Sequence, residues 1–130
     1  MRVLALDYGS ARCGCAVSDP TGTIATPLEV VARPATRRGL GRLAALVREH
    51  AVEIVLVGLP LSLSGADSAQ TAEARAFAER LQERLGDAAS VRLYDERFTT
   101  ALARRDGGGQ AAEDARAAAH LLQSWLAAQS

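Results

Sequence analysis

Four acidic residues stand where a folded chain could bring them to one place. Asp7 ends the apolar run 3–6, the pair Asp95 and Glu96 ends a later apolar run, and Asp114 opens the last helical pattern. A carboxylate at the end of a buried strand needs a cation, an ion pair or hydrogen bonds, because an unpaired buried charge is strongly destabilising. Open α/β sheets form their sites at the carboxyl ends of strands, so we expect these acids to lie at one edge.

Asp114 lies on an apolar stripe of its helix. The residues three, four, seven and eleven positions further on are all apolar: Ala117, Ala118, Leu121 and Trp125. Side chains at this spacing share one helix face, which predicts that Asp114 lies on the face that packs against the sheet. The alternative is that an acid in the first turn only stabilises the positive end of the helix dipole.

Converging carboxylates indicate a particular chemistry. Like charges at short range repel and raise one another's pKa unless a cation neutralises them. Hard oxygen ligands select Mg²⁺ or Mn²⁺. Two such ions about 3.5–4 Å apart can clamp the attacking water and the leaving oxygen of a phosphodiester. The acids therefore suggest a metal-dependent phosphoryl-transfer site, although each alone could be a helix cap or a salt-bridge partner.

The elements that must position these acids follow from the hydrophobic period. Strands are expected at 2–8, 12–18, 22–32, 54–57 and 91–94. Helices are expected from about Thr36, from Ser68 to Gly86, from Thr99 or Thr100, and from about Ala112 to Ala127. Short turns make the first three strands an antiparallel meander, and Pro27 indicates an edge or a bulge in the third. The later alternation of helix and strand predicts parallel pairing, hence a five-stranded mixed α/β sheet with helices on both faces.

Composition narrows the class of protein. The chain has 130 residues, with 15 basic residues (all Arg) balanced by 15 acidic ones, and suits a single domain over 1–130. The neutral balance argues against nonspecific coating of nucleic acid. We see no signal peptide and no membrane-spanning run, so we expect a cytoplasmic protein. Cys13 and Cys15 would point to one face of a strand, which indicates core thiols and not a disulfide.

Four stretches, in this order, resemble the motifs of the YqgF (RuvX) family: LALDYGSARCGCAVSD, GLPLSLSGADSAQTAEARAFAERL, YDERFTT and EDARAAAHLLQSWL. The resemblance covers nearly the whole chain. It implies a ribonuclease-H-like fold related to the resolvases that cut Holliday junctions. Members are described as nucleases that mature the 5′ end of pre-16S ribosomal RNA, or as junction resolvases. The resemblance thus implies a metal-dependent endonuclease acting on nucleic acid, with pre-16S rRNA preferred to branched DNA.

The same resemblance implies the site residues. The metal ligands, for Mg²⁺ or Mn²⁺, would be Asp7, Glu96 (or its neighbour Asp95) and Asp114. Two arginines would hold a phosphate with a planar charged fork, or else pair with these acids: Arg12 and Arg97. Backbone close to the substrate is expected at Gly9, Gly58 and Pro60. Ser68 could receive a phosphate, but helix capping is the simpler role.

One departure from the family concerns substrate binding. Between the DER motif and Asp114 the family commonly has a longer, Lys/Arg-rich segment, whereas here Arg104, Arg105 and Asp106 are followed by three glycines. Because phosphate neutralisation supplies most nonspecific affinity, this segment predicts weaker binding. The remaining basic supply is in the first long helix and is either a backbone-contacting patch or a solvated face: Arg37, Arg38, Arg42 and Arg48.

Three other possibilities stay open from the sequence. The chain could be a binding module that keeps the fold but cuts poorly. An acid followed by Tyr-Gly-Ser also resembles actin-like ATPases, but those need two such domains and this chain supplies one. The protein could be a monomer or a homodimer, and a resolvase making two symmetric cuts would need two active sites.

Overall fold

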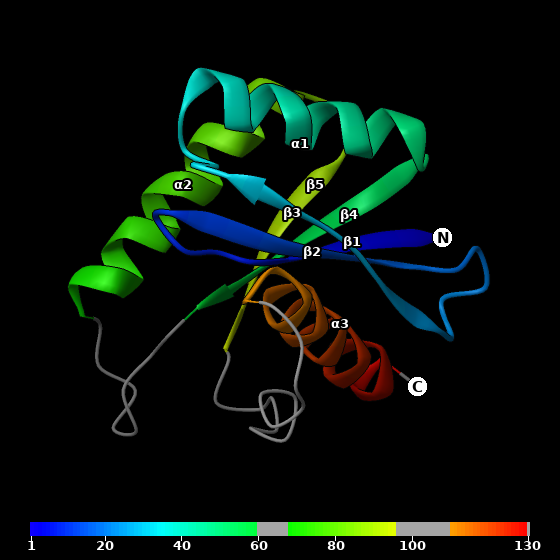
Figure 1. Ribbon diagram of the computed structural model, residues 1–130. Helices are drawn as coiled ribbons and strands as arrows, with labels where there is room; N and C mark the ends of the chain where they lie inside the picture. The colour runs from blue at the N-terminus through cyan, green and yellow to red at the C-terminus, as the bar shows by residue number, and fades with distance from the viewer. Residues whose placement is uncertain (60–67, 96–109, 130) are drawn as a thin grey trace.

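The computed structural model describes residues 1–59, 68–95 and 110–129. Within them, one sheet has the strand order β3-β2-β1-β4-β5 (Figure 1). The strands are β1 (Arg2–Asp7), β2 (Arg12–Ser18), β3 (Ala25–Ala32), β4 (Val52–Leu59) and β5 (Ser90–Asp95). The helices are α1 (Arg37–Glu49), α2 (Ala69–Leu85) and α3 (Gln110–Ala128). The short helix expected from Thr99 or Thr100 lies outside the described residues.

Strand pairing confirms the mixed sheet. β2 pairs antiparallel with both β1 and β3, whereas β4 pairs parallel with β1 and with β5. The parallel pairs are joined by α1 and α2, and the antiparallel ones by short turns, as the change of hydrophobic period predicts. β1 is therefore the central strand, with β2 on one side and β4 on the other.

Helices cover both faces of the sheet, and each face has its own core. On one face, α1 and α2 pack with Leu4 and Leu6 of β1 around the fully buried Phe77. On the other, α3 packs Leu122 and Trp125 against a second set of residues, including Val3 and Ala5 of β1 (Figure 1). Because strand side chains alternate, residue parity along β1 decides which helix layer a side chain meets.

β3 is an edge strand with a bulge, as Pro27 indicated. Cys15 pairs with Glu29 and Ala16 pairs with Pro27, so Leu28 is an extra residue in the ladder. Proline lacks an N–H for the ladder and is tolerated at such edges and bulges.

β3 begins at Ala25 and not at residue 22, because a turn precedes it. The Asp19 carboxylate accepts hydrogen bonds from the backbone N–H groups of Thr23 (2.7 Å) and Ile24 (2.8 Å), and from the Thr21 hydroxyl. These hydrogen bonds hold the pKa of Asp19 well below its usual range. An Asp that organises its own turn in this way competes with the extended strand.

Two smaller expectations are also confirmed. Cys13 and Cys15 are free, buried thiols in the core under α1 and α2. Ser68 caps α2: its hydroxyl accepts from the Thr71 N–H at 3.3 Å, and the Ser68 N–H donates to the Thr71 hydroxyl at 3.2 Å. Among the described residues, no helix is both long enough and apolar enough to cross a membrane.

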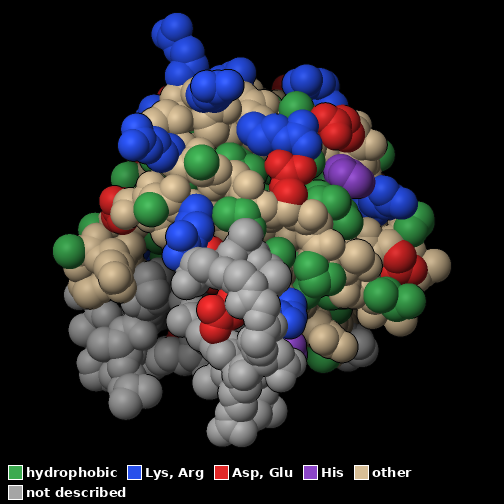
Figure 2. Space-filling model, in the orientation of Figure 1, with side chains coloured by type: hydrophobic (Ala, Val, Ile, Leu, Met, Phe, Trp, Pro, Cys, Tyr) green, Lys and Arg blue, Asp and Glu red, His purple; other side chains and the backbone are tan. Residues whose placement is uncertain are grey.

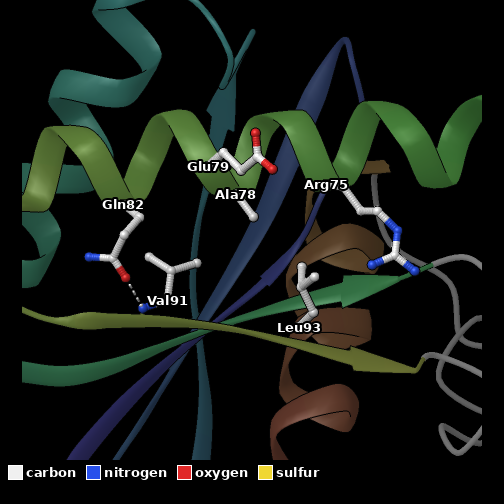
Figure 3. A pocket seen from close by; sticks show the side chains of 6 residues that line it. All are labelled: Arg75, Ala78, Glu79, Gln82, Val91 and Leu93. Atoms are coloured by element: carbon white, nitrogen blue, oxygen red, sulfur yellow. Dashed lines mark hydrogen bonds between the residues drawn. The ribbon is translucent and has the colours of Figure 1, made fainter.

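At the other edge of the sheet, one side chain ties α2 to β5. A groove of about 270 Å³ lies between them, with Val91 and Leu93 on its floor (Figure 3). Beside it, the Gln82 amide oxygen accepts from the Val91 N–H at 2.8 Å, and the amide nitrogen donates to the carbonyls of Gly86 and Ala89 at 3.0 Å each. Gln82 thus holds the start of this edge strand against the helix.

We predict that Gln82→Ala lowers the free energy of unfolding by about 1–2 kcal/mol. The change removes three hydrogen bonds of modest net value and leaves backbone groups of the turn and of β5 without their partner. Urea denaturation would measure the change. The control is Glu83→Ala, one residue along on the exposed side of α2, which should stay within about 0.5 kcal/mol of the wild type. Equal stability of the Gln82 variant and its control would contradict this role.

Candidate active site

The site forms where α3 contacts the sheet, at Gly14. Gly14 lies in β2 directly opposite Asp7 of β1. On the same face it touches the backbone of α3: a Cβ at position 14 would overlap the Asp114 carbonyl group and lie 3.0 Å from the Ala115 nitrogen. A glycine inside a strand often marks such a close backbone approach. Here it brings the first turn of α3 beside the end of β1.

Asp7 and Asp114 share this face. Asp7 has the parity of Val3 and Ala5, whose side chains pack under α3, so its side chain follows them to that side. Asp114 has the helical spacing of the buried residues Ala118 and Trp125, and its side chain is 20% exposed. The predicted sheet-facing stripe of the last helix is therefore confirmed. Both carboxylates lie at the half-buried rim of the second core.

Arg12 pairs with one of these acids. Its Nε–H donates to Asp114 Oδ2 at 2.5 Å, and the side chains of Arg12 and Asp114 are 47% and 20% exposed. Of the two roles that the sequence allowed for Arg12, the structure has the ion pair with an acid. A pair this open to water contributes about 0–1 kcal/mol to stability, so its main effect is on local charge.

The thiol of Cys13 also responds to this charge. Its pKa is raised well above the usual value, first by a hydrogen bond with Cys15, then by burial, with smaller contributions from the negative charges of Cys15, Asp7 and Asp114. Cys13 lies in the core on the opposite side of β2. The thiol therefore stays protonated and unreactive, and both acids contribute to the field inside the sheet.

Asp95 lies at the end of β5 but on the other face. Val91 and Leu93 line the groove beside α2, and Asp95 has their parity. Tyr94 alternates to the α3 side, where its hydroxyl lies 3.0 Å from that of Ser124. The structure therefore does not group Asp95 with Asp7 and Asp114.

The remaining predicted residues are only partly covered. Gly58 lies in β4 opposite Tyr94. Glu96, Arg97 and Pro60 lie outside the described residues. Within the described ranges, no group of three His, Cys, Asp or Glu side chains could hold a metal ion.

The turn after Asp7 is held from the other face. The ring of Tyr8 stacks on Phe77 of α2, with centroids 4.4 Å apart and planes inclined by 24°. Burial raises the pKa of the Tyr8 hydroxyl, and the negative charge of Glu73 adds to the shift. A Cβ at Gly9 would lie 2.8 Å from the Arg12 carbonyl oxygen, so the turn itself requires glycine there. Gly9 thus has a structural role before any substrate is considered.

Sequence reasoning missed Gly14 and the Tyr8–Phe77 stack. The only signal for Gly14 was a glycine inside an otherwise apolar strand, which is common enough to pass unnoticed. The stack has no local signal, because its two rings come from residues far apart in the chain.

The donors present at this site suit a hard divalent cation. The side chains of Asp7 and Asp114 offer only carboxylate oxygens, the ligands that Mg²⁺ and Mn²⁺ prefer. Their shared face is half-buried, so their repulsion is screened less than in bulk water. Arg12 offsets that repulsion at Asp114 alone.

The sheet order, the acid that ends the central strand and the acid that opens the helix across the sheet define the class: a ribonuclease-H-like α/β domain. The solved structure "T. thermophilus RuvC in complex with Holliday junction substrate" has the same fold. It matches with a TM-score of 0.60 and 20% identity, over 100% of this chain and 96% of that chain. A second structure of Thermus thermophilus RuvC matches with a TM-score of 0.58.

The family model described as "RuvX: Holliday junction resolvase" matches residues 1–128, and this chain belongs to the RuvX family. A relative from Nocardia farcinica is 44% identical over 96% of this chain and 77% of its own length. Another, from an Anaeromyxobacter species, is 42% identical over 97% of this chain and 96% of its own. Both carry the name "Putative pre-16S rRNA nuclease". The family resemblance noted from the motifs is confirmed.

We predict that Gly14→Ala destabilises the protein by roughly 1–3 kcal/mol or more, because the new methyl group meets helix backbone that cannot move alone. Urea denaturation would measure the loss. The matched control is Gly41→Ala in α1, where a Cβ meets only the flexible end of Arg84, at 3.2 Å. Alanine in a helix interior gains about 0.5–1 kcal/mol over glycine, so the control should be neutral or more stable. A Gly14 variant as stable as the wild type would show that the contact is not essential.

Proposed function

We propose that this protein is a divalent-metal-dependent endonuclease that matures the 5′ end of pre-16S ribosomal RNA. The observation that carries the proposal is the meeting of Asp7 and Asp114 on one face of the sheet around Gly14. The names of relatives at 42–44% identity over nearly the whole chain support the substrate. A ribosomal precursor is a cytoplasmic substrate, so we assign the activity to the cytoplasm.

Asp7, Asp114 and Glu96 would hold Mg²⁺ or Mn²⁺. We choose Glu96 over Asp95 because Asp95 has the parity of the residues that face α2. In an extended chain the following residue turns to the opposite face, which is the face of Asp7. A bound cation would supply Lewis-acid stabilisation of the negative charge that develops on the phosphate.

The other family positions would bind the substrate. Arg12 keeps Asp114 ionised through its ion pair and would contact a phosphate with the rest of its guanidinium. Arg97 would act in the same way. Substrate backbone would approach the chain closely at three positions: Gly9, Gly58 and Pro60.

A second substrate has a specific observation behind it. The family model is described as a Holliday junction resolvase, and the RuvC structure of the same fold holds a Holliday junction. A resolvase of this kind would act as a dimer, because it must make two symmetric cuts. A weakly catalytic binding module is the remaining alternative, and it would bind RNA without metal-dependent cleavage.

Asp7→Asn should reduce cleavage of a labelled pre-16S 5′ leader RNA by at least about 100-fold in Mg²⁺ or Mn²⁺. The change keeps the size of the side chain but removes the charge that a hard cation requires. A second readout is independent of catalysis: Mn²⁺ should raise the melting temperature of the wild type and raise that of the variant less.

The matched control is Asp19→Asn, the same substitution in the turn between β2 and β3, where Asp19 accepts hydrogen bonds from its own turn. It should cleave at the wild-type rate. A four-way DNA junction cut in preference to the RNA would favour the resolvase instead. If the folded wild type cut neither substrate, the nuclease proposal would be wrong and the binding module would replace it.

A further inference from the structure

A groove of about 570 Å³ runs between the outer edge of β3 and the first turns of α1, and we call it the β3–α1 groove. Its walls include the end of β3 on one side and Thr36 and Gly39 of α1 on the other. Three arginines line it: Arg33, Arg38 and Arg42. β3 is the last strand on this side of the described sheet, so nothing in the described chain pairs with its outer edge.

The groove lies in the most basic part of the chain. Residues 30–48 contain five of the 15 basic residues and no acidic residue. In the space-filling view, basic side chains gather over α1 (Figure 2). A protein of zero net charge therefore carries a local positive surface, which is the electrostatic pattern expected of a site for a polyanion.

The three arginines of the groove are not equivalent. Arg42 donates to both oxygens of Glu29, at 2.7 and 2.9 Å, and to Glu49 at 3.2 Å. These partners raise the pKa of Arg42 and lower that of Glu29, so the charge of Arg42 is already neutralised. Arg33 and Arg38 are exposed and form no ion pair with any acid in the described ranges. They carry the positive charge of the groove.

The position of Arg38 increases this charge. α1 has no acidic residue in its first turn, and Thr36 caps it with a neutral hydroxyl. Basic side chains at the positive end of a helix dipole are unfavourable unless an anion offsets them. The arrangement lowers stability in the free protein, and an anion bound in the groove would remove that penalty.

The groove is continuous with the candidate active site. Ala32 at its end pairs with Arg12 across the sheet, and the Arg33 N–H donates to the Ala11 carbonyl at 2.9 Å. Arg12 in turn pairs with Asp114. β3 lies two strand spacings, or about 10 Å, from the strand that carries Asp7. One nucleic-acid strand can therefore span both places.

We propose that the β3–α1 groove binds the phosphodiester backbone of the RNA strand that enters the active site, with Arg33 and Arg38 each contacting a phosphate. The inference rests on the proposed nuclease function and extends its substrate path. It also gives a source for the phosphate contacts that the short segment before α3 does not provide. An extended acidic peptide along the edge of β3 is the competing occupant, and the charge pattern alone favours neither its side chains nor its backbone polarity.

The test is binding of a fluorescein-labelled pre-16S 5′ leader RNA, followed by fluorescence anisotropy in chelator across a range of salt concentrations. The variant Arg33→Gln with Arg38→Gln removes the two charges and keeps side-chain length. Each lost phosphate contact on a single strand lowers the slope of log K against log salt by about 0.7, so the slope should fall by about 1.4. The charge-matched control is Arg48→Gln with Arg92→Gln, two exposed arginines at the far end of α1 and on the opposite edge strand. It should keep the wild-type slope.

The outcomes separate this inference from the nuclease itself. An unchanged slope in the groove variant, or an equal fall in the control, overturns the groove even if the wild type cleaves RNA. A fall confined to the groove variant supports the groove even if no cleavage is seen. Polyglutamate that binds as tightly as the RNA, with the same loss in the groove variant, would assign the groove to acidic peptides and overturn the proposal. No RNA binding by the folded wild type at low salt would also overturn it.

Discussion

The missing side chain of Gly14 is the constraint on which the site depends. A helix that packs on a sheet is normally held away by the side chains of both surfaces, and α3 is held away in this manner where Trp125 and Leu122 pack. At Gly14 the backbone of α3 rests directly on β2. Because Gly14 is opposite Asp7, the one point of closest approach is also the point where the central strand ends. The acid at the start of α3 therefore reaches the acid of β1 without a loop to position it.

This arrangement also explains how an apolar strand can end in a carboxylate. Asp7 is not in either core: it lies at the rim, one residue past the fully buried Leu6. Its neighbour Asp114 is compensated by Arg12, which is itself half in solvent. Partial exposure and one counter-ion are enough to keep two acids ionised at short range, with little gain in stability. A site built in this way stays charged and accessible, as cation binding requires.

Local patterns in the sequence predicted much of this. The change of hydrophobic period gives the meander and the later parallel strands, Pro27 marks the edge strand, and helical spacing turns Asp114 toward the sheet. What the patterns could not supply depends on contacts between distant segments. Nothing local to Arg12 says that its partner is Asp114, 102 residues away. The face on which Asp95 lies became clear only from the register of β5, because a single strand pattern does not tell which side faces which helix.

Net charge is a poor guide to this protein's surface, and the reason is structural. Fifteen basic and fifteen acidic residues cancel in the sum, but Arg42 pairs with both Glu29 and Glu49, so these acids are not available to the other arginines. The pairing concentrates positive charge at the start of α1, at the end of the sheet that holds Arg12. Weak long-range attraction limits binding to arbitrary nucleic acid, whereas a short basic surface beside the acids favours a strand that engages both. In a chain of this size, selectivity then comes from the continuity of groove and site, and not from total charge.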